Sequence, residues 1–188
     1  MKVNLNSLRV LYAEDDTDTR EALSVILNKF FLEVVVAKNG QQGIDLFQEY
    51  NDKDIEINMI LSDINMPHKN GLEMIAEIRE VNNNIPVILM TAHAEANFLM
   101  DAINLNVAQY LVKPVNIPLL FEKIKLAYLP IHQKVLLKQK NIELEQLNQK
   151  IKEIAKKEMD ELRLGYNYVS DNDEIDFGEL LDSITLDE

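Results

Sequence analysis

Five short apolar runs, separated by amphipathic stretches, constrain the fold of this chain more than any other feature of its sequence. Each run holds five or six residues rich in Val, Ile and Leu, and polar or turn residues bound it. Runs of this kind are typical of strands that a parallel sheet buries on both faces. We therefore expect fully buried strands at residues 9–13, 33–37, 57–62, 86–91 and 108–112.

The stretches between the runs have helical periodicity. Apolar residues recur at spacings of one, three and four, which places them on one face of a helix. Pro118 suits the first turn of the last of these helices. The alternation predicts five β-α units and an α/β fold, in which helices cover both faces of a doubly wound, five-stranded parallel sheet. The apolar helix positions are Leu23, Ile26, Leu27 and Phe30, then Leu72, Ile75 and Ile78, then Phe98, Leu99, Ala102 and Ile103.

The segment 130–163 changes character, because it is rich in Leu, Glu, Lys and Gln and lacks Gly. Leu and Ile fit the a and d positions of a short heptad seam, and polar residues break it at both ends. Pro130 can kink or interrupt a helix at this point. We expect a long, kinked or interrupted helix after residues 1–129, with a possible homodimer through 131–163; a solvated helix that folds back is the alternative. The seam residues are Leu137, Leu144, Leu147, Ile151 and Ile154.

The segment 164–188 carries eight acidic and no basic side chains. Within it, Phe177, Leu180, Leu181 and Ile184 recur on one face of a short amphipathic helix. We expect this acidic tail to dock, either on its own domain or in a groove of a partner protein.

Composition excludes several classes of function. The net charge of −13 leaves no basic patch dense enough for nucleic acid. No run of eighteen apolar residues is present, so we expect no membrane span. The absence of cysteine excludes disulfides and thiolate chemistry and makes the cytoplasm the default location.

Polar residues with complementary chemistry follow the predicted strands. Because the carboxyl ends of parallel strands meet at one edge, these residues should share a crevice. Carboxylates held together need a cation, and hard oxygen ligands suit Mg²⁺. A lysine and a hydroxyl can steady phosphoryl oxygens, and a carboxylate can accept a phosphoryl group. A single acid at a helix start often only caps the helix, but several convergent groups are harder to explain in that way. They are Glu14, Asp15, Asp63, Thr91 and Lys113.

The segments VLYAEDD, ILSDINMPHKNGLEMI, IPVILMTAHA and QYLVKPV, in this order and spacing, resemble the receiver domain of bacterial two-component response regulators. The resemblance covers roughly residues 7–129. It implies a flavodoxin-like (βα)5 fold, Mg²⁺ as cofactor, and a sensor histidine kinase or phosphotransfer protein as phosphoryl donor. It also implies that the chain is no enzyme beyond its own phosphorylation and autodephosphorylation.

The resemblance assigns roles at the phosphorylation site. It implies that Asp63 is the phosphoacceptor and that Glu14 and Asp15 are the acidic pair, Asp15 being the direct Mg²⁺ ligand. Asn65 would lend its backbone carbonyl to the metal. Lys113 would contact the phosphoryl group and precede Pro114 in a cis peptide bond.

The resemblance also assigns a switch. It implies that Thr91 supplies a hydroxyl that moves toward the phosphoryl group and that Tyr110 then swings inward. Asn65 and His93 occupy the two variable positions that tune phosphoryl lifetime in this family, and Gly71 fits its loop glycine.

We expect a phospho-accepting response regulator whose phosphorylation switches association with an unknown downstream protein rather than DNA binding. A receiver fragment of a longer hybrid kinase or cyclase is one alternative. A haloacid-dehalogenase-like phosphatase is a weaker one, because it needs a second Asp where Asn65 stands. A degenerate receiver that takes no phosphate is also weak, because every site residue is present.

Overall fold

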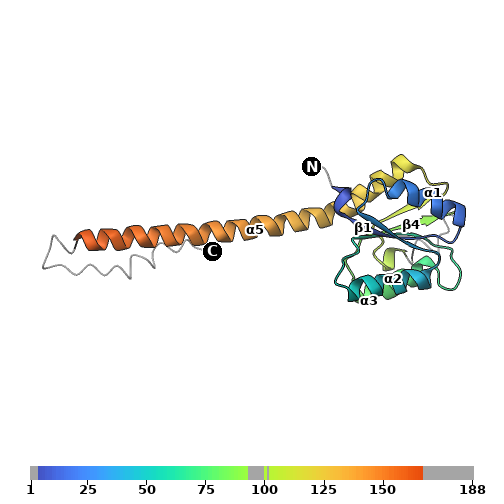
Figure 1. Cartoon of the computed structure of the whole chain (residues 1–188), viewed down its shortest axis with the longest axis horizontal. Helices are drawn as coiled ribbons and strands as arrows, with labels where there is room; N and C mark the ends of the chain where they lie inside the picture. Colours follow the sequence, from blue (N-terminus) through green and yellow to red (C-terminus); the bar gives the residue numbers. More distant parts are fainter. Residues whose placement is uncertain (1–3, 93–99, 101, 167–188) are drawn as a thin grey trace. The chain divides into compact units, whose positions relative to one another are not determined.

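The computed structural model describes residues 4–92, 100 and 102–166, with the backbone alone for residues 163–166. Its strands and helices alternate along most of the chain (Figure 1). In chain order they are η1 (Leu5–Ser7), β1 (Arg9–Ala13), α1 (Thr17–Leu27), β2 (Glu33–Ala37), α2 (Gly40–Asp52), β3 (Met59–Asp63), α3 (Gly71–Val81), β4 (Val87–Thr91), β5 (Gln109–Val112) and α5 (Ile117–Tyr166).

The strands form one five-stranded sheet in the order β2-β1-β3-β4-β5, and every neighbouring pair is parallel. The chain passes from β1 to β2 on one side of β1 and then crosses to β3 on the other side, which is the arrangement of a doubly wound sheet. The predicted flavodoxin-like α/β fold is therefore confirmed. Because β3 lies in the centre of the sheet, between β1 and β4, its last residue Asp63 comes out in the middle of the sheet edge.

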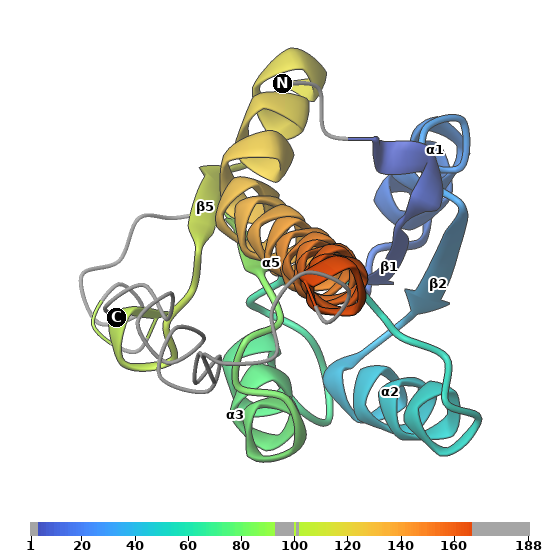
Figure 2. The same cartoon turned by 90° about the vertical axis from the view of Figure 1, so that its left-hand side faces the viewer.

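Helices cover both faces of the sheet and bury two apolar clusters. Figure 2 shows α2 and α3 on one face, with α1 and the first turns of α5 on the other. One cluster joins α2 and α3 to the sheet through Ile44, Phe47 and Ile75. The other joins α1 and α5 to the opposite face through Leu27 and Leu120. The sheet side chains of both clusters are almost fully excluded from water, which is the main stabilising contribution in a domain of this size.

The expectation that all five strands are fully buried is wrong for the two edge strands. β1, β3 and β4 are buried over almost their whole length, but β2 and β5 alternate between buried and more exposed residues. Each edge strand has a single neighbour, so helices on the two faces cover it less completely. On β5 this leaves Tyr110 and Val112 about half exposed.

Side-chain caps begin the helices next to the carboxyl ends of the strands. Asp16 accepts a hydrogen bond from the backbone N–H of Thr19 at 2.8 Å and so caps α1. Asn70 and Glu73 form a reciprocal capping box at the start of α3. These caps place the first turns of both helices directly after the strand ends that carry the acidic residues.

The helix predicted around Phe98 to Ile103 is only partly described. Met100 and residues 102–104 are helical, in agreement with the periodicity, whereas Phe98 and Leu99 lie outside the described residues. The amphipathic segment with Phe177 and Ile184 also lies outside them.

The expected long helix is present, and α5 continues through Pro130, so it is not interrupted there. Pro118 lies in the first turn of α5, as predicted. By its internal contacts the chain divides into a unit of residues 1–135 and a second unit of residues 136–188, whose described part is helical. Among the described residues, no helix is both long enough and apolar enough to cross a membrane.

Candidate functional site

Three carboxylates meet at the carboxyl edge of the sheet. Glu14 and Asp15 follow β1, and Asp63 ends β3, the neighbouring strand. One carboxylate oxygen from each lies within 4.8 Å of the others. Glu14 is fully buried and Asp63 is only 7% exposed, whereas Asp15 faces solvent. The cluster thus has two enclosed acids and one open side.

The ammonium group of Lys113 joins two of these acids. Lys113 directly follows β5, and its Nζ donates hydrogen bonds to Oε1 and Oε2 of Glu14 at 2.9 and 2.7 Å. The same Nζ donates to Oδ2 of Asp63 at 2.6 Å. All three N–H groups therefore donate to carboxylate oxygens in charge-assisted hydrogen bonds, and both ion pairs are largely enclosed. The peptide bond between Lys113 and Pro114 is cis, as the resemblance implied.

Burial and pairing shift the pKa values of this pair. Burial raises the pKa of the Glu14 carboxyl, and the hydrogen bonds from Lys113 oppose that rise. Burial also acts against the charge on Lys113, but the hydrogen bonds to Asp63 and Glu14 outweigh it and raise the pKa of the ammonium above 10.5. The ammonium is therefore held in its charged form between the two acids.

The backbone around Asp63 fixes the direction of its side chain. The backbone N–H of Ile64 donates to Oδ1 at 2.7 Å, so Oδ2 is the oxygen that meets Lys113. The Ser62 hydroxyl donates to the Asp63 carbonyl at 2.7 Å. The N–H of Gly71 donates to the Ile64 carbonyl at 2.8 Å and closes the loop after β3.

Gly71 is required by this close approach. A Cβ at this position would lie 2.1 Å from the Asp63 carbonyl oxygen and 2.9 Å from Ser62 Oγ. The first turn of α3 can therefore press against the acidic residue only because the side chain is absent. This gives a steric reason for the loop glycine that the sequence singled out.

Arg20 is part of the site's framework and was not found by sequence reasoning. Its Nη1 donates to the carbonyl oxygens of Glu14 and Asp15, both at 2.9 Å. It thereby ties the first turn of α1 to the end of β1 and orients the acidic pair. A single arginine in a helix carries no motif, so only the tertiary contacts reveal this role. The neighbouring Asp16 is a helix cap.

The remaining predicted residues are distributed around the cluster. Thr91 ends β4 and is 5% exposed, and its carbonyl accepts the backbone N–H of Lys113 at 2.8 Å. Tyr110 lies on β5 and is 50% exposed. Asn65 is exposed in the loop two residues after Asp63. His93 lies outside the described residues.

The donor set of the acidic cluster fits a hard divalent cation. The grouped side chains offer carboxylate oxygens only, with no sulfur or imidazole nitrogen among them. Mg²⁺ favours such oxygen ligands. It is bound by few protein groups and keeps water or phosphate at its other coordination positions. The exposed Asp15 leaves the open side that such a site needs.

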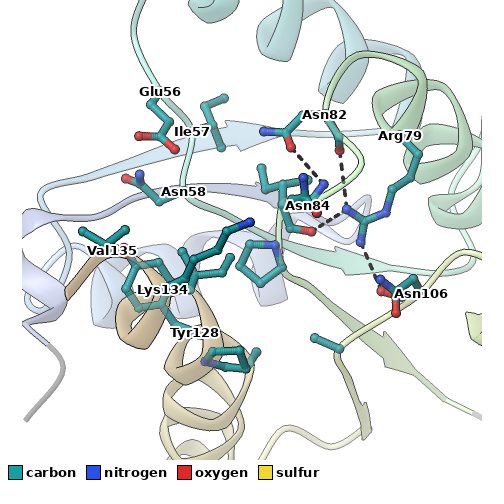
Figure 3. A pocket seen from close by; sticks show the side chains of 16 residues that line it. Glu56, Ile57, Asn58, Arg79, Asn82, Asn84, Asn106, Tyr128, Lys134 and Val135 are labelled. Carbon is teal, nitrogen blue, oxygen red and sulfur yellow. Dashed lines mark hydrogen bonds between the residues drawn. The ribbon is translucent and has the colours of Figure 1, made fainter. Parts of the chain in front are cut away.

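A separate hollow of about 490 Å³ lies at the opposite, amino-terminal edge of the sheet (Figure 3). Arg79 lies in its wall and donates to the backbone carbonyls of Leu105, Ile85 and Asn106 at 3.1, 2.6 and 3.2 Å. The guanidinium group thus binds the loops before β4 and β5 together. This use of Arg79 indicates a structural role, and the acidic cluster lies at the other end of the strands.

The comparisons with known proteins agree on one family. The family described as "Response regulator receiver domain" matches residues 10–125. A stretch of 120 residues is 38% identical to hybrid signal transduction histidine kinase I of Dictyostelium discoideum and covers 62% of this chain but 7% of that protein. Regulatory protein AtoC of Escherichia coli is 32% identical over 58% of this chain and 23% of its own length. This chain therefore matches only a small part of these two relatives.

Solved structures give the same result for the fold. The N-terminal domain of an uncharacterized protein from Wolinella succinogenes is 34% identical, with a TM-score of 0.60 over 68% of this chain and 99% of that one. A CheY-like response regulator receiver domain protein from Methanospirillum hungatei is 27% identical, with a TM-score of 0.57 over 63% of this chain and 91% of that one.

Proposed function

Because the chain belongs to the response regulator receiver domain family, we propose that it receives a phosphoryl group on Asp63 and passes the signal on through protein association. The observation that supports this most is the meeting of Asp63 with Glu14, Asp15 and Lys113 at one edge of the sheet. A nucleophilic carboxylate, a cation site and a phosphate-binding amine are the groups that phosphoryl transfer to an aspartate needs.

In the proposed reaction, a carboxylate oxygen of Asp63 attacks the phosphorus of a phosphohistidine. A new O–P bond forms while the N–P bond to the histidine breaks, and the imidazole nitrogen regains its electron pair. Oδ1 is held by the backbone N–H of Ile64, and Oδ2 faces the ammonium of Lys113, so we assign the attack to Oδ2. Lys113 lies within hydrogen-bond distance of that oxygen and can follow the transferred group.

We propose that Asp15, Asp63 and the backbone carbonyl of Asn65 hold Mg²⁺ directly, with Glu14 behind them. When bound, the ion would neutralise the negative charge that builds up on the oxygens of the transferred phosphoryl group. Arg20 keeps the acidic pair in place through its bonds to the carbonyls of Glu14 and Asp15. On the buried side of the site, the ammonium of Lys113 compensates the negative charge of Glu14.

The proposed switch follows from the charge added at Asp63. A phosphoryl group brings new acceptor oxygens, toward which Lys113 and the hydroxyl of Thr91 turn. The space left by Thr91 is then available to Tyr110, whose side chain is half exposed on the edge strand. Reversing a 1:99 equilibrium requires about 5.5 kcal/mol of differential stabilisation. A few charge-assisted hydrogen bonds of about 1.5–3 kcal/mol each are of that order.

The proposed partners are proteins. The donor would be a sensor histidine kinase or a phosphotransfer protein in the cytoplasm. The output would be a changed association of the β5 edge, of the helix at 131–163 or of the acidic tail, with a second copy or a downstream protein. A net charge of −13 argues against nucleic acid as the target.

One alternative keeps the same site but changes its setting. The likeness to a hybrid signal transduction histidine kinase, of which this chain matches 7%, favours a receiver within a longer protein. The phosphatase alternative has no supporting observation, because Asn65 cannot act as the acid that it requires.

The test is phosphorylation with acetyl phosphate and Mg²⁺, followed by intact-protein mass. The wild-type protein should gain one phosphoryl group, and Asp63→Asn should gain none. Asp45→Asn is the matched control, because Asp45 lies on α2 with its carboxylate bound to Gln41, and it should label like the wild type.

Equal labelling of wild type and Asp63→Asn would contradict the assignment of Asp63 as the phosphoacceptor. Labelling that persists in excess chelator would contradict the proposed need for Mg²⁺ but would leave Asp63 as the acceptor. Circular dichroism of the variants should match the wild type, so that lost labelling is not confused with lost fold.

A further inference from the structure

The second half of α5 presents an apolar seam to solvent, and its ends carry opposite charges. Leu144, Leu147, Ile151 and Ile154 are each more than half exposed within the described chain. They alternate at spacings of three and four, the a and d positions of two heptads. Extending the same register puts Lys140 just before this seam and Glu158 just after it, both exposed.

We propose that this segment pairs with a second copy of the chain in antiparallel orientation, centred on Gln149. This refines the self-association through 131–163 in the proposed function by specifying its direction and register. It concerns the unphosphorylated protein and does not depend on Asp63. The argument rests on which residues face one another in the two possible orientations.

In a parallel pair, each residue of the seam faces its own copy. Lys140 would face Lys140, and Glu158 would face Glu158, so that both ends of the apolar seam would bring like charges together. Like charges at such positions are destabilising, and they disfavour this partner orientation. The apolar part is only two heptads long and would have to overcome both repulsions.

In an antiparallel pair, facing residues lie equally far before and after the centre. Centred on Gln149, Lys140 faces Glu158 of the second copy, and this ion pair occurs at both ends. Between the ends, Leu144 faces Ile154 and Leu147 faces Ile151. Each of these four apolar residues then meets an apolar residue, and the two charged interruptions neutralise each other. Leu137, one turn before Lys140, faces Glu161 outside this apolar stretch.

The flanking charges at the two ends of the seam support the same orientation, although Lys150, at the same heptad edge near the centre, would lie beside Lys150 of the second copy. Glu143 and Lys157 lie at the same heptad edge, each between an end of the apolar seam and the charged residue that flanks it. In the antiparallel pair they come to the same side of the interface and attract each other. In the parallel pair these edges meet Asn148 and Leu162, which carry no charge.

The intrahelical ion pairs do not oppose this exchange. In a single helix Lys140 is 3.1 Å from Glu143, and Lys157 is 3.9 Å from Glu161. All four side chains are at least two-thirds exposed, and pairs of this kind contribute little. They can be replaced by contacts to the second copy while the apolar seam leaves water.

Charge reversal in the full-length protein tests the orientation by sedimentation equilibrium. Lys140→Glu places like charges at both ends of the antiparallel pair, so the dissociation constant of the dimer should rise at least about ten-fold. The double variant Lys140→Glu/Glu158→Lys restores opposite charges and should restore dimerisation. Lys138→Glu is the matched control: it makes the same charge change off the seam and should not weaken the dimer.

A parallel pair predicts a different pattern, because each single or double reversal leaves like charges facing each other. Failure of the double variant to recover would therefore overturn the antiparallel orientation. A wild-type protein that stays monomeric at all concentrations would overturn the pairing itself, and would leave phosphorylation of Asp63 untouched.

Disulfide trapping gives an independent reading, because the chain has no cysteine of its own. Leu144→Cys and Ile154→Cys proteins, distinguished by tags of different size, are mixed and oxidised. The antiparallel pair predicts a disulfide between the two different variants. Disulfides that form only between identical chains would contradict it.

Discussion

The ammonium nitrogen of Lys113 lies 2.6 Å from Oδ2 of Asp63, although β4 separates the strands that deliver them. Lys113 reaches across this strand because its side chain is long and its ammonium also binds both oxygens of Glu14. The bridge compensates two enclosed carboxylates at once.

Lys113→Met should destabilise the fold most strongly when chelator removes divalent ions. Glu14 is fully buried, and its removal from water is compensated by the ammonium. We expect the free energy of unfolding to fall by about 2–3 kcal/mol in excess chelator, and by less in Mg²⁺. Urea denaturation under both conditions measures this.

Lys123→Met serves as the control for that experiment. Lys123 donates to Gln109 at 2.9 Å and contacts no acid of the cluster, so its replacement should show no difference between chelator and Mg²⁺. An equal loss for Lys113→Met under both conditions would contradict the idea that the cation and the ammonium compensate the same charges.

The stability that Lys113 contributes should disappear at high pH. The folded state raises the pKa of its ammonium above 10.5, so the folded protein holds this proton more tightly than the unfolded chain. The contribution is fully present below pH 10.5 and is lost as the pH rises through the raised folded value. The difference in unfolding free energy between wild type and Lys113→Met, followed from about pH 9 upward, should therefore shrink.

Tyr12→Phe should stabilise the protein. Among the residues that the structure describes, Tyr12 has a fully buried hydroxyl that makes no hydrogen bond. Burial, with the charges of Glu14 and Asp63 as further causes, raises its pKa far above the ordinary value. Removing this oxygen should raise the free energy of unfolding by about 1 kcal/mol in thermal or urea denaturation.

Tyr50→Phe is the contrasting variant, because the Tyr50 hydroxyl donates a hydrogen bond to Glu33. Its loss should lower the free energy of unfolding by about 0.5–1 kcal/mol. A destabilised Tyr12→Phe protein would show that its hydroxyl has a partner in solution.

Gly71→Ala should damage both fold and site. Its Cβ would lie 2.1 Å from the carbonyl oxygen of Asp63, so the loop after β3 must move. We expect a loss of at least about 2 kcal/mol in stability and slower labelling by acetyl phosphate. Ala76→Gly in the same helix, at an exposed position, should cost only about 1 kcal/mol and leave the labelling rate unchanged.

Mimicking phosphorylation should change how the chain associates. Beryllofluoride with Mg²⁺ should alter the mass or hydrodynamic radius measured by light scattering, and it should have no effect on Asp63→Asn. If wild type does not respond either, phosphorylation does not control self-association, and the output would have to pass to a different protein.

The sequence by itself determined the strands, the helix periodicities and the position of Asp63 at the end of a buried run. These features depend on neighbours three or four residues apart, or on the alternation of apolar and polar segments. The resemblance then added the switch role of Thr91, the residues Tyr110 and Asn65, and the cis bond before Pro114, of which the structure bears out the last.

Only the tertiary structure decided which side chains touch. Lys113 and Glu14 are 99 positions apart in the sequence. Their contact exists because the sheet places β3 beside β1, and β5 two positions beyond β3. Arg20 orients the acidic pair through carbonyl groups, which no side-chain motif records. The unequal burial of edge and central strands likewise depends on the number of neighbours in the sheet, a property of the fold that local sequence does not contain.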